Sequence, residues 1–225
     1  MKKLFFASVL AIIPTVVFAD FHNRKQIMQV PQAEFQIAME KDFARYMADM
    51  KTAKFYVEPD QRSKAIFERI KKEAVKQHPE AKNWNWVLFG DLQNRFNAFG
   101  GLYGKVILGT NLFDQSLFTD DELAFVIAHE VIHSLKDHAR EKYNLNDGSP
   151  EYIALAQTVE FEADYLALDL LQKSNYDPEK SLGYLKKMRN FYALLKVQQG
   201  GNSASHPSIA VRYERLHELI KQSSY

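Results

Sequence analysis

The chain has 225 residues, enough for a single domain with a sizeable hydrophobic core. Its 29 basic and 28 acidic residues give a formal net charge of +1, and this balance argues against a nucleic-acid-binding protein. Because the sequence contains no cysteine, structural disulfides and a lipid-modified N-terminal cysteine are both excluded.

The N-terminus has the pattern of a secretory signal peptide, which we assign to residues 1–19. Two lysines are followed by an apolar stretch from Leu4 to Phe18, and Val17 and Ala19 are small residues at the cleavage positions. A retained membrane anchor is the alternative, but a bilayer span needs about 17–25 apolar residues and a proline within the stretch weakens a helix. We therefore expect cleavage, and a soluble mature protein in the periplasm or secreted from the cell.

Two amphipathic helices are predicted next, over about residues 31–50 and 60–78. In both segments the apolar residues recur three and four positions apart, which is the spacing of one helix face. Residues 20–30, ahead of them, show no such periodicity. We expect residues 20–30 to form a leader on the surface.

Residues 84–108 differ in character from the segments around them. Residues 84–89, 96–99 and 105–108 are short strand candidates rich in aromatic and branched residues, with glycines between them. We interpret this region as a small antiparallel sheet of about three strands.

The remainder of the chain is predicted to be helical. Thr119 and Glu122 form a capping box ahead of an apolar run, and Ser149 followed by proline starts a second helix that ends near Lys173. Further helices are expected from 178 to about 197 and from 207 to 222, joined by a loop at 198–205. The predicted fold class is α+β and mainly helical. A single domain would span residues 20–225, with N-terminal helices at about 31–78 and a catalytic core at about 84–222.

The first capped helix contains the sequence His-Glu-Val-Ile-His at residues 129–133. Two histidines four residues apart lie about 40° apart around an α-helix, so His129 and His133 can bind one metal ion. Glu130 projects from the same turn, where it can act as a general base on a zinc-bound water. The alternative is a helix that buries three polar residues by chance, at a cost of several kcal/mol for each one without a partner. We favour a catalytic zinc site.

A third zinc ligand is expected in the buried helix that follows, since a catalytic zinc ion has three protein ligands. Glu160 and Asp164 are four residues apart and share a face, while Glu162 points to the other side. Glu160 is the preferred ligand, and Asp164 can accept a hydrogen bond from a ligand histidine. His138 is a weaker candidate, because a continuous helix would place it about 180° from His129; it more simply lies at the helix end and is not a ligand.

With these motifs in place, the sequence resembles the zinc metallopeptidase family of HtpX and the CAAX prenyl proteases, in particular its soluble secreted branch. The resemblance covers about residues 84–215, although the usual proline is missing between Phe99 and Gly104. The sequence also lacks the additional hydrophobic spans of the membrane-embedded branches of the family. The segments that carry it are residues 97–99, 121–124, 129–133, 160–164, 176–178 and 206–212.

The resemblance implies a zincin-like domain with one zinc ion per chain. It implies that Glu160 is the third ligand, that Asp164 supports the site, and that His206 and Arg212 lie close to the reaction. It also implies a strand edge beside the cleft, where substrate adds as an extended strand and contacts the residues Asn97, Ala98 and Phe99.

The function expected from these features is zinc-dependent endopeptidase activity on unfolded or misfolded envelope proteins, that is, protein quality control. Glu130 would activate the zinc-bound water, and His206 or Arg212 would help to stabilise the oxyanion. Two alternatives remain. One is a zinc-binding holdase or adaptor without proteolytic activity, and the other is a hydrolase for small molecules, such as an amidase.

Overall fold

The structure is a computed structural model that describes residues 21–195 and 205–223. The predicted signal peptide and nearly all of the predicted loop at 198–205 lie outside these residues. Along the described chain the helices and strands follow in this order: η1 (Phe21–Asn23), α1 (Gln32–Thr52), β1 (Tyr56–Val57), α2 (Gln61–Gln77), η2 (Pro79–Asn83), β2 (Val87–Asp91), β3 (Ala98–Phe99), β4 (Lys105–Gly109), η3 (Thr110–Phe113), α3 (Asp120–Leu135), α4 (His138–Lys142), α5 (Pro150–Lys173), α6 (Pro178–Ser181), α7 (Gly183–Leu195) and α8 (Ile209–Ser223).

The mainly helical α+β class is confirmed, and most helices begin and end near the predicted residues. The capping box of α3 is present: the backbone N–H of Thr119 donates to the Glu122 carboxylate over 2.7 Å, and the Thr119 hydroxyl accepts from the Glu122 N–H. At α5 the Ser149 hydroxyl accepts a hydrogen bond from the Tyr152 N–H, without a reciprocal bond. The segment predicted as one helix from 178 to 197 is instead two helices, α6 and α7.

The prediction of an antiparallel sheet is wrong, because the sheet is mixed. It has four strands in the order β1-β2-β4-β3, so β4 lies between its two predecessors in the chain. As a result β4 is parallel to β2 and antiparallel to β3. Successive short strands often pair as hairpins, but here the chain between β2 and β3 crosses to the far edge of the sheet. The two-residue strand β1, antiparallel to β2, is too short to show a pattern in the sequence.

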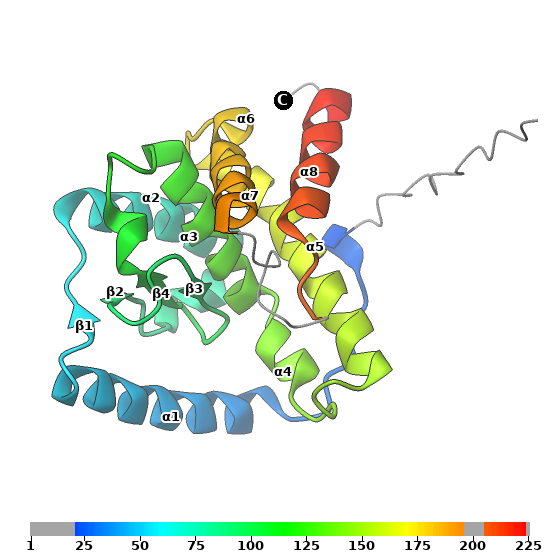
Figure 1. The fold of residues 1–225 in the computed structure, drawn as a ribbon. Helices are drawn as coiled ribbons and strands as arrows, with labels where there is room; N and C mark the ends of the chain where they lie inside the picture. Colours follow the sequence, from blue (N-terminus) through cyan, green and yellow to red (C-terminus); the bar gives the residue numbers. More distant parts are fainter. Residues whose placement is uncertain (1–20, 196–204, 224–225) are drawn as a thin grey trace, which may run out of the picture.

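Helix α3 is the centre of the fold. Figure 1 shows it between the sheet and α5, and it also packs against α2, α6 and α7. Every residue from Glu122 to Ser134 is buried, so this part of the helix is covered by other elements on all sides. Burial on all sides fixes the position of any functional side chain on α3.

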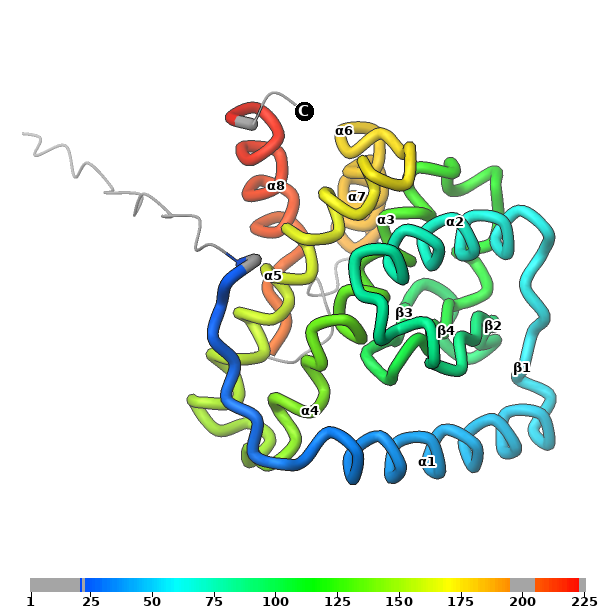
Figure 2. The backbone as a smooth tube through the Cα atoms, turned by 180° about the vertical axis from the view of Figure 1, so that it is seen from behind, coloured from blue at the N-terminus to red at the C-terminus, as the bar shows by residue number. Residues whose placement is uncertain are grey.

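The segment ahead of α1 is only partly the surface leader that we expected. Residues 21–30, which we call the N-terminal strap, run along α5 and past α4 before α1 crosses the bottom of the molecule (Figures 1 and 2). The side chain of Arg24 turns inward and is only 15% exposed. Its carboxylate partners on α4 and α5 are more than 100 positions away in the chain, and for that reason the sequence did not reveal them.

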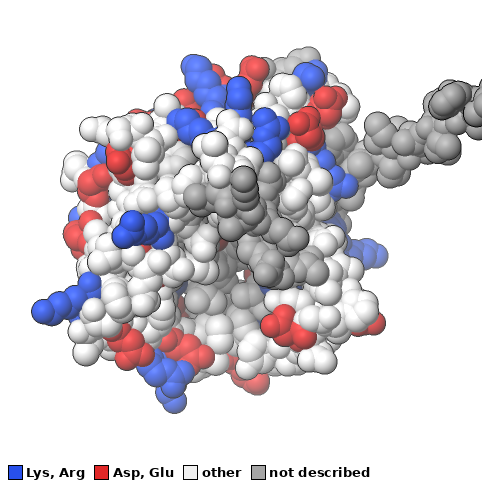
Figure 3. All heavy atoms as spheres, viewed as in Figure 1, with Lys and Arg blue, Asp and Glu red and all other residues white. Residues whose placement is uncertain are grey.

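The surface has no strong charge of one sign on the face shown in Figure 3, where basic and acidic side chains are interspersed around the periphery. This distribution agrees with the balanced composition. Among the helices that the structure describes, none combines the length and the apolar character of a membrane span.

Candidate active site

Helix α3 brings the two histidines and the glutamate of the His-Glu-Val-Ile-His motif to the wall of one cleft. His129 and His133 are 6% and 8% exposed, and their Nε2 atoms are 3.1 Å apart. The helix spacing explains this proximity, since residues four apart share a face. Glu130 is 8% exposed and lines the same cleft.

Helix α5 supplies the third member of the cluster, Glu160. Its Oε2 atom lies 3.5 Å from the His129 Nε2 atom, and its Oε1 atom lies 3.5 Å from the His133 Nε2 atom. Burial by itself would raise the pKa of Glu160, but the neighbouring histidines and Arg212 outweigh it and hold the pKa well below its usual range. Glu160 therefore carries a negative charge that faces two imidazole nitrogens.

This His-His-Glu cluster fits a metal ion of the zinc type. Among the described residues, His129, His133 and Glu160 form the group that could hold an ion, with their ligand atoms all within 4.8 Å of one another. Two atoms bound about 2.0–2.2 Å from a tetrahedral zinc ion are about 3.3–3.6 Å apart, and the observed separations of 3.1–3.5 Å are close to that. Two nitrogens and one carboxylate oxygen are also the ligand types of zinc hydrolases.

The His129 ring is held from behind by Asp164 on α5. The His129 Nδ1 atom lies 3.0 Å from the Asp164 Oδ1 atom, so a proton on Nδ1 leaves Nε2 free to face the cluster. Arg212 on α8 donates two hydrogen bonds to Asp164, of 2.8 Å from Nε and 2.6 Å from Nη2. Burial would raise the pKa of Asp164, but Arg212 and His129 reverse the effect and lower it. The carboxylate is therefore ionised and doubly anchored.

The His133 ring has a different partner, His138. Helix α3 ends at Leu135, and Asp137 adopts left-handed backbone angles with φ 54°, so the chain changes direction before α4 begins at His138. This turn brings the His138 Nδ1 atom to 2.8 Å from the His133 Nδ1 atom. His138 lies outside the His-His-Glu cluster. A continuous helix would have kept the His133 and His138 rings apart.

Behind His138 lies Glu162, a residue that we assigned no role from the sequence. Its side chain is fully buried, and its Oε2 atom lies 3.3 Å from the His138 Nε2 atom. Glu162 faces away from Glu160, as its position on α5 predicted, but into a second buried polar network rather than into solvent. The signal in the sequence was a third acidic residue, between Glu160 and Asp164, in a largely apolar part of the helix.

The general-base candidate Glu130 is desolvated and closely covered. Burial raises the pKa of Glu130 to about 7, with His129 acting in the opposite direction. The turn after β3 covers it so tightly that a Cβ atom at Gly100 would lie 2.7 Å from the Glu130 carbonyl oxygen. Only glycine fits at this position, so the backbone of the turn lies directly against α3.

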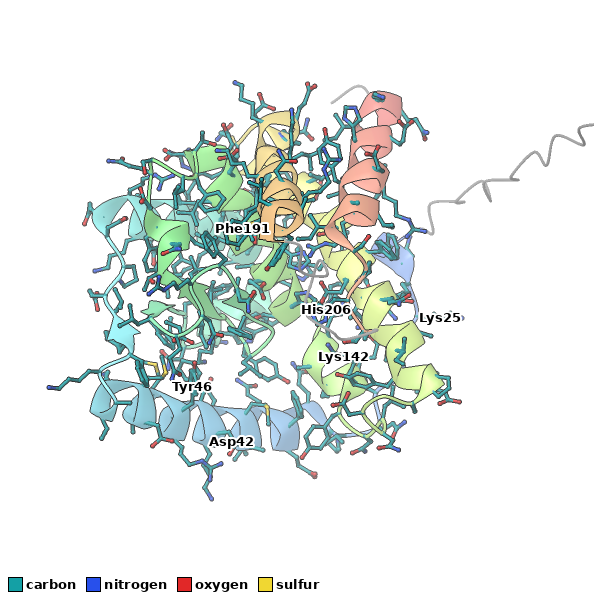
Figure 4. The ribbon with its side chains drawn as sticks, viewed as in Figure 1. Lys25, Asp42, Tyr46, Lys142, Phe191 and His206 are labelled. Carbon is teal, nitrogen blue, oxygen red and sulfur yellow. The ribbon has the colours of Figure 1, made fainter. Side chains whose placement is uncertain are left out.

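The cleft in front of the cluster has a volume of about 470 Å³. The predicted substrate-contacting residues Asn97, Ala98 and Phe99 line one side of it. His206, with a side chain 55% exposed, lies ahead of α8 with its Nε2 atom 3.7 Å from the Glu160 Oε1 atom. In Figure 4, His206 and Lys142 of α4 lie near the middle of the molecule, and both line the cleft.

One wall of the cleft is mainly aromatic and apolar, which the sequence did not predict. Tyr184, Met188 and Tyr192 are four residues apart on α7 and present one face to the cleft. Phe125 and Val126, one turn ahead of His129 on α3, continue this wall. The helical spacing was visible in the sequence, but it did not distinguish a cleft wall from ordinary core packing.

The cluster, the adjacent carboxylate and the open cleft form an arrangement of the kind that zinc metallopeptidases use. The family model of peptidase family M48 matches residues 58–156, a segment that runs from α2 into α5 and includes His129, Glu130 and His133 but stops before Glu160. A search of curated proteins gave no match. The family-model match supports the M48 metallopeptidase family, the family to which the motifs in the sequence pointed.

Proposed function

We propose that the protein is a zinc-dependent endopeptidase that cleaves unfolded or misfolded polypeptides of the cell envelope. The observation that carries the proposal is the presence of three features in one cleft: the His-His-Glu cluster, the buried carboxylate of Glu130, and strand β3. Within the described part of the chain β3 pairs with β4 on one side only. An extended peptide can add to the other side through backbone hydrogen bonds, which do not depend on sequence.

The apolar wall of the cleft favours the interpretation that the substrate is an unfolded polypeptide. Unfolded chains expose large apolar side chains that folded proteins bury. Tyr184, Met188 and Phe125 offer such side chains a surface within the same cleft as the cluster. A partly apolar cleft beside an open strand edge suits a polypeptide better than the closed, polar pocket expected for a small amide.

In the proposed mechanism His129, His133 and Glu160 hold the zinc ion. When bound, zinc would lower the pKa of a coordinated water and polarise the scissile carbonyl. Glu130 would accept the proton from the attacking water and then deliver it to the leaving amine. Gly100 keeps the edge strand next to Glu130, so that the bound peptide and the base lie on the same side of the cleft.

The oxyanion role is assigned to His206 rather than to Arg212. His206 is half-exposed at the cleft, where it can reach a substrate oxygen. The Arg212 guanidinium is already committed to Asp164 through two hydrogen bonds. We infer that Arg212 acts mainly through Asp164, by orienting His129.

The test is hydrolysis of casein by residues 20–225 and by the Glu130→Gln variant, both loaded with zinc. We expect cleavage by the parent and none by the variant, with equal zinc content. Loss of zinc from the variant would show that Glu130 has a structural rather than a catalytic role. Zinc binding without cleavage by either protein would favour the holdase or adaptor, and cleavage of small amides alone would favour the amidase.

The proposed location in the periplasm or outside the cell rests on the predicted signal peptide. Expression of the full chain in a bacterium, followed by N-terminal sequencing, tests it. A mature protein that begins at Asp20 in the periplasmic fraction supports the proposal. An intact N-terminus in the cytoplasm or membrane would contradict it.

A further inference from the structure

A buried polar network behind His133 has no part in the mechanism proposed above. It consists of His138 on α4, Glu162 on α5, Glu141 on α4 and Arg24 in the N-terminal strap. The Glu162 and Glu141 side chains are 0% and 4% exposed. Two buried carboxylates in one network are costly unless a cation is shared between them.

Arg24 is the cation shared by both carboxylates. Its Nη1 and Nη2 atoms each donate to Glu141 over 2.7 Å, and its Nε atom donates to Glu162. The rigid, planar guanidinium thus sets the position of Glu162 relative to α4. The Lys136 Nζ atom lies 3.1 Å from the Glu162 Oε1 atom. Lys136 thus neutralises charge on Glu162, but it does not connect Glu162 with Glu141.

The strap is attached to the same region at further points along its length. Gln26 donates to the Lys136 carbonyl oxygen over 2.6 Å and to Glu141 over 2.9 Å. Arg140 donates to the Val30 carbonyl oxygen over 2.9 Å. The path of residues 21–30 along α5 in Figure 2 is therefore held by specific hydrogen bonds as well as by proximity.

A series of close approaches then connects the strap with the metal cluster. Glu162 lies 3.3 Å from the His138 Nε2 atom, and the His138 Nδ1 atom lies 2.8 Å from the His133 Nδ1 atom. The His133 Nε2 atom faces Glu160 in the cluster. Hydrogen bonds to the rear nitrogen of a ligand histidine set its tautomer and ring orientation, and losing such a partner weakens metal binding about 10–100-fold.

We propose that the N-terminal strap is a positioning element of the metal centre: Arg24 fixes Glu162, Glu162 holds the His138 ring, and His138 orients His133 toward the ion. Arg24 is thus a positioning residue for a site assembled more than 100 positions later in the chain. The inference rests on the proposed role of His133 as a metal ligand.

The first experiment measures zinc affinity by competition with a chromogenic chelator, using residues 20–225. We expect the Arg24→Ala variant to bind zinc about tenfold more weakly than the parent. Lys25→Ala is the matched control, because Lys25 is the neighbouring residue of the strap, is exposed and lies on its outer side (Figure 4). Equal affinity of Arg24→Ala and Lys25→Ala would overturn the proposal, whereas failure of the parent to bind zinc would contradict the metal site itself.

A double-mutant cycle separates positioning from general loss of stability. If Arg24 acts through His138, Arg24→Ala lowers zinc affinity in the parent but causes no further loss in the His138→Ala variant. If the two substitutions lower zinc affinity independently, so that their fold-changes multiply in the double variant, the proposal is overturned. The visible spectrum of the cobalt-loaded proteins gives a second measure, since a change in ligand geometry alters the bands and a purely structural defect in the apoprotein does not.

The proposal stays testable if Arg24→Ala fails to fold. Glu162→Gln keeps the shape of the side chain and removes the charge between Arg24 and His138. We expect it to weaken zinc binding by at least as much as Arg24→Ala, while its zinc-free form still shows cooperative thermal unfolding. Parent-like zinc affinity in Glu162→Gln would overturn the proposal.

Discussion

The two histidines of the cluster are supported from behind in two different ways. Behind His129 stand Asp164 and Arg212, a carboxylate on α5 and a guanidinium on α8. Behind His133 stand His138 and Glu162, and their guanidinium comes from the strap at the other end of the chain. Both supports end in an arginine that pairs with a carboxylate of α5. The comparison indicates that the N-terminal and C-terminal segments each stabilise one half of the site.

The two supports also differ in whether their residues belong to one helix or to separate segments of the chain. Asp164 shares a helix face with Glu160, so one rigid helix positions both a ligand and the partner of a ligand. The support of His133 instead depends on the turn at Asp137 and on Arg24, which lies in a part of the strap, residues 24–30, that forms no helix or strand. We expect the His129 side to contribute more to stability and the His133 side to be more easily disturbed.

The largest expected effect comes from the ligand that both histidines share. Glu160→Ala removes the carboxylate that faces the two Nε2 atoms, so we expect zinc affinity to fall by more than about 100-fold and hydrolysis to be lost. Measurement of zinc content after dialysis, together with casein cleavage, checks this. Stoichiometric zinc in the variant would show that another residue completes the site.

Removing Arg212 tests the His129 support. Arg212→Met keeps much of the side-chain volume but leaves the buried carboxylate of Asp164 without its cation. We expect the free energy of unfolding of the zinc-free protein to fall by about 3 kcal/mol, measured by urea denaturation. A smaller loss of unfolding free energy in Arg24→Ala than in Arg212→Met would support this difference between the two supports. An equal loss in the two variants would contradict it.

The cleft wall can be changed without touching either support. In Gly100→Ala the new methyl group would meet the Glu130 backbone, so the turn after β3 must move away from α3. We expect kcat to fall at least about tenfold, since a displacement of about 1 Å can cost 100-fold, while zinc affinity stays at the parent value. A loss of zinc affinity would show that the turn also holds the cluster.

The smallest effect is expected at the start of α3, far from both supports. Thr119→Ala removes the capping hydroxyl, which typically contributes about 1 kcal/mol to stability. We expect a lower unfolding temperature with unchanged zinc affinity and unchanged kcat. A change in zinc affinity here would mean that stability and metal binding are not separable in this fold, which would also weaken the interpretation of the Arg24 variants.

The metal cluster could be predicted from the sequence because its geometry is mainly helical. The spacing of His129 and His133, and that of Glu160 and Asp164, places each pair on one face whatever the rest of the fold does. The capping box at Thr119 and the proline after Ser149 located the two helices for a similarly local reason. These features depend on contacts within about four residues.

What only the tertiary structure decided involves residues distant in the chain. The mixed sheet arises because β4 inserts between β2 and β3, and short strands carry no signal for their order. The left-handed turn at Asp137 brings His138 to His133, and a residue pattern does not specify such a turn. Arg24 contacts Glu162 across 138 positions of chain. Local spacing determines which side chains share a helix face, but the packing of separate segments decides what lies behind them.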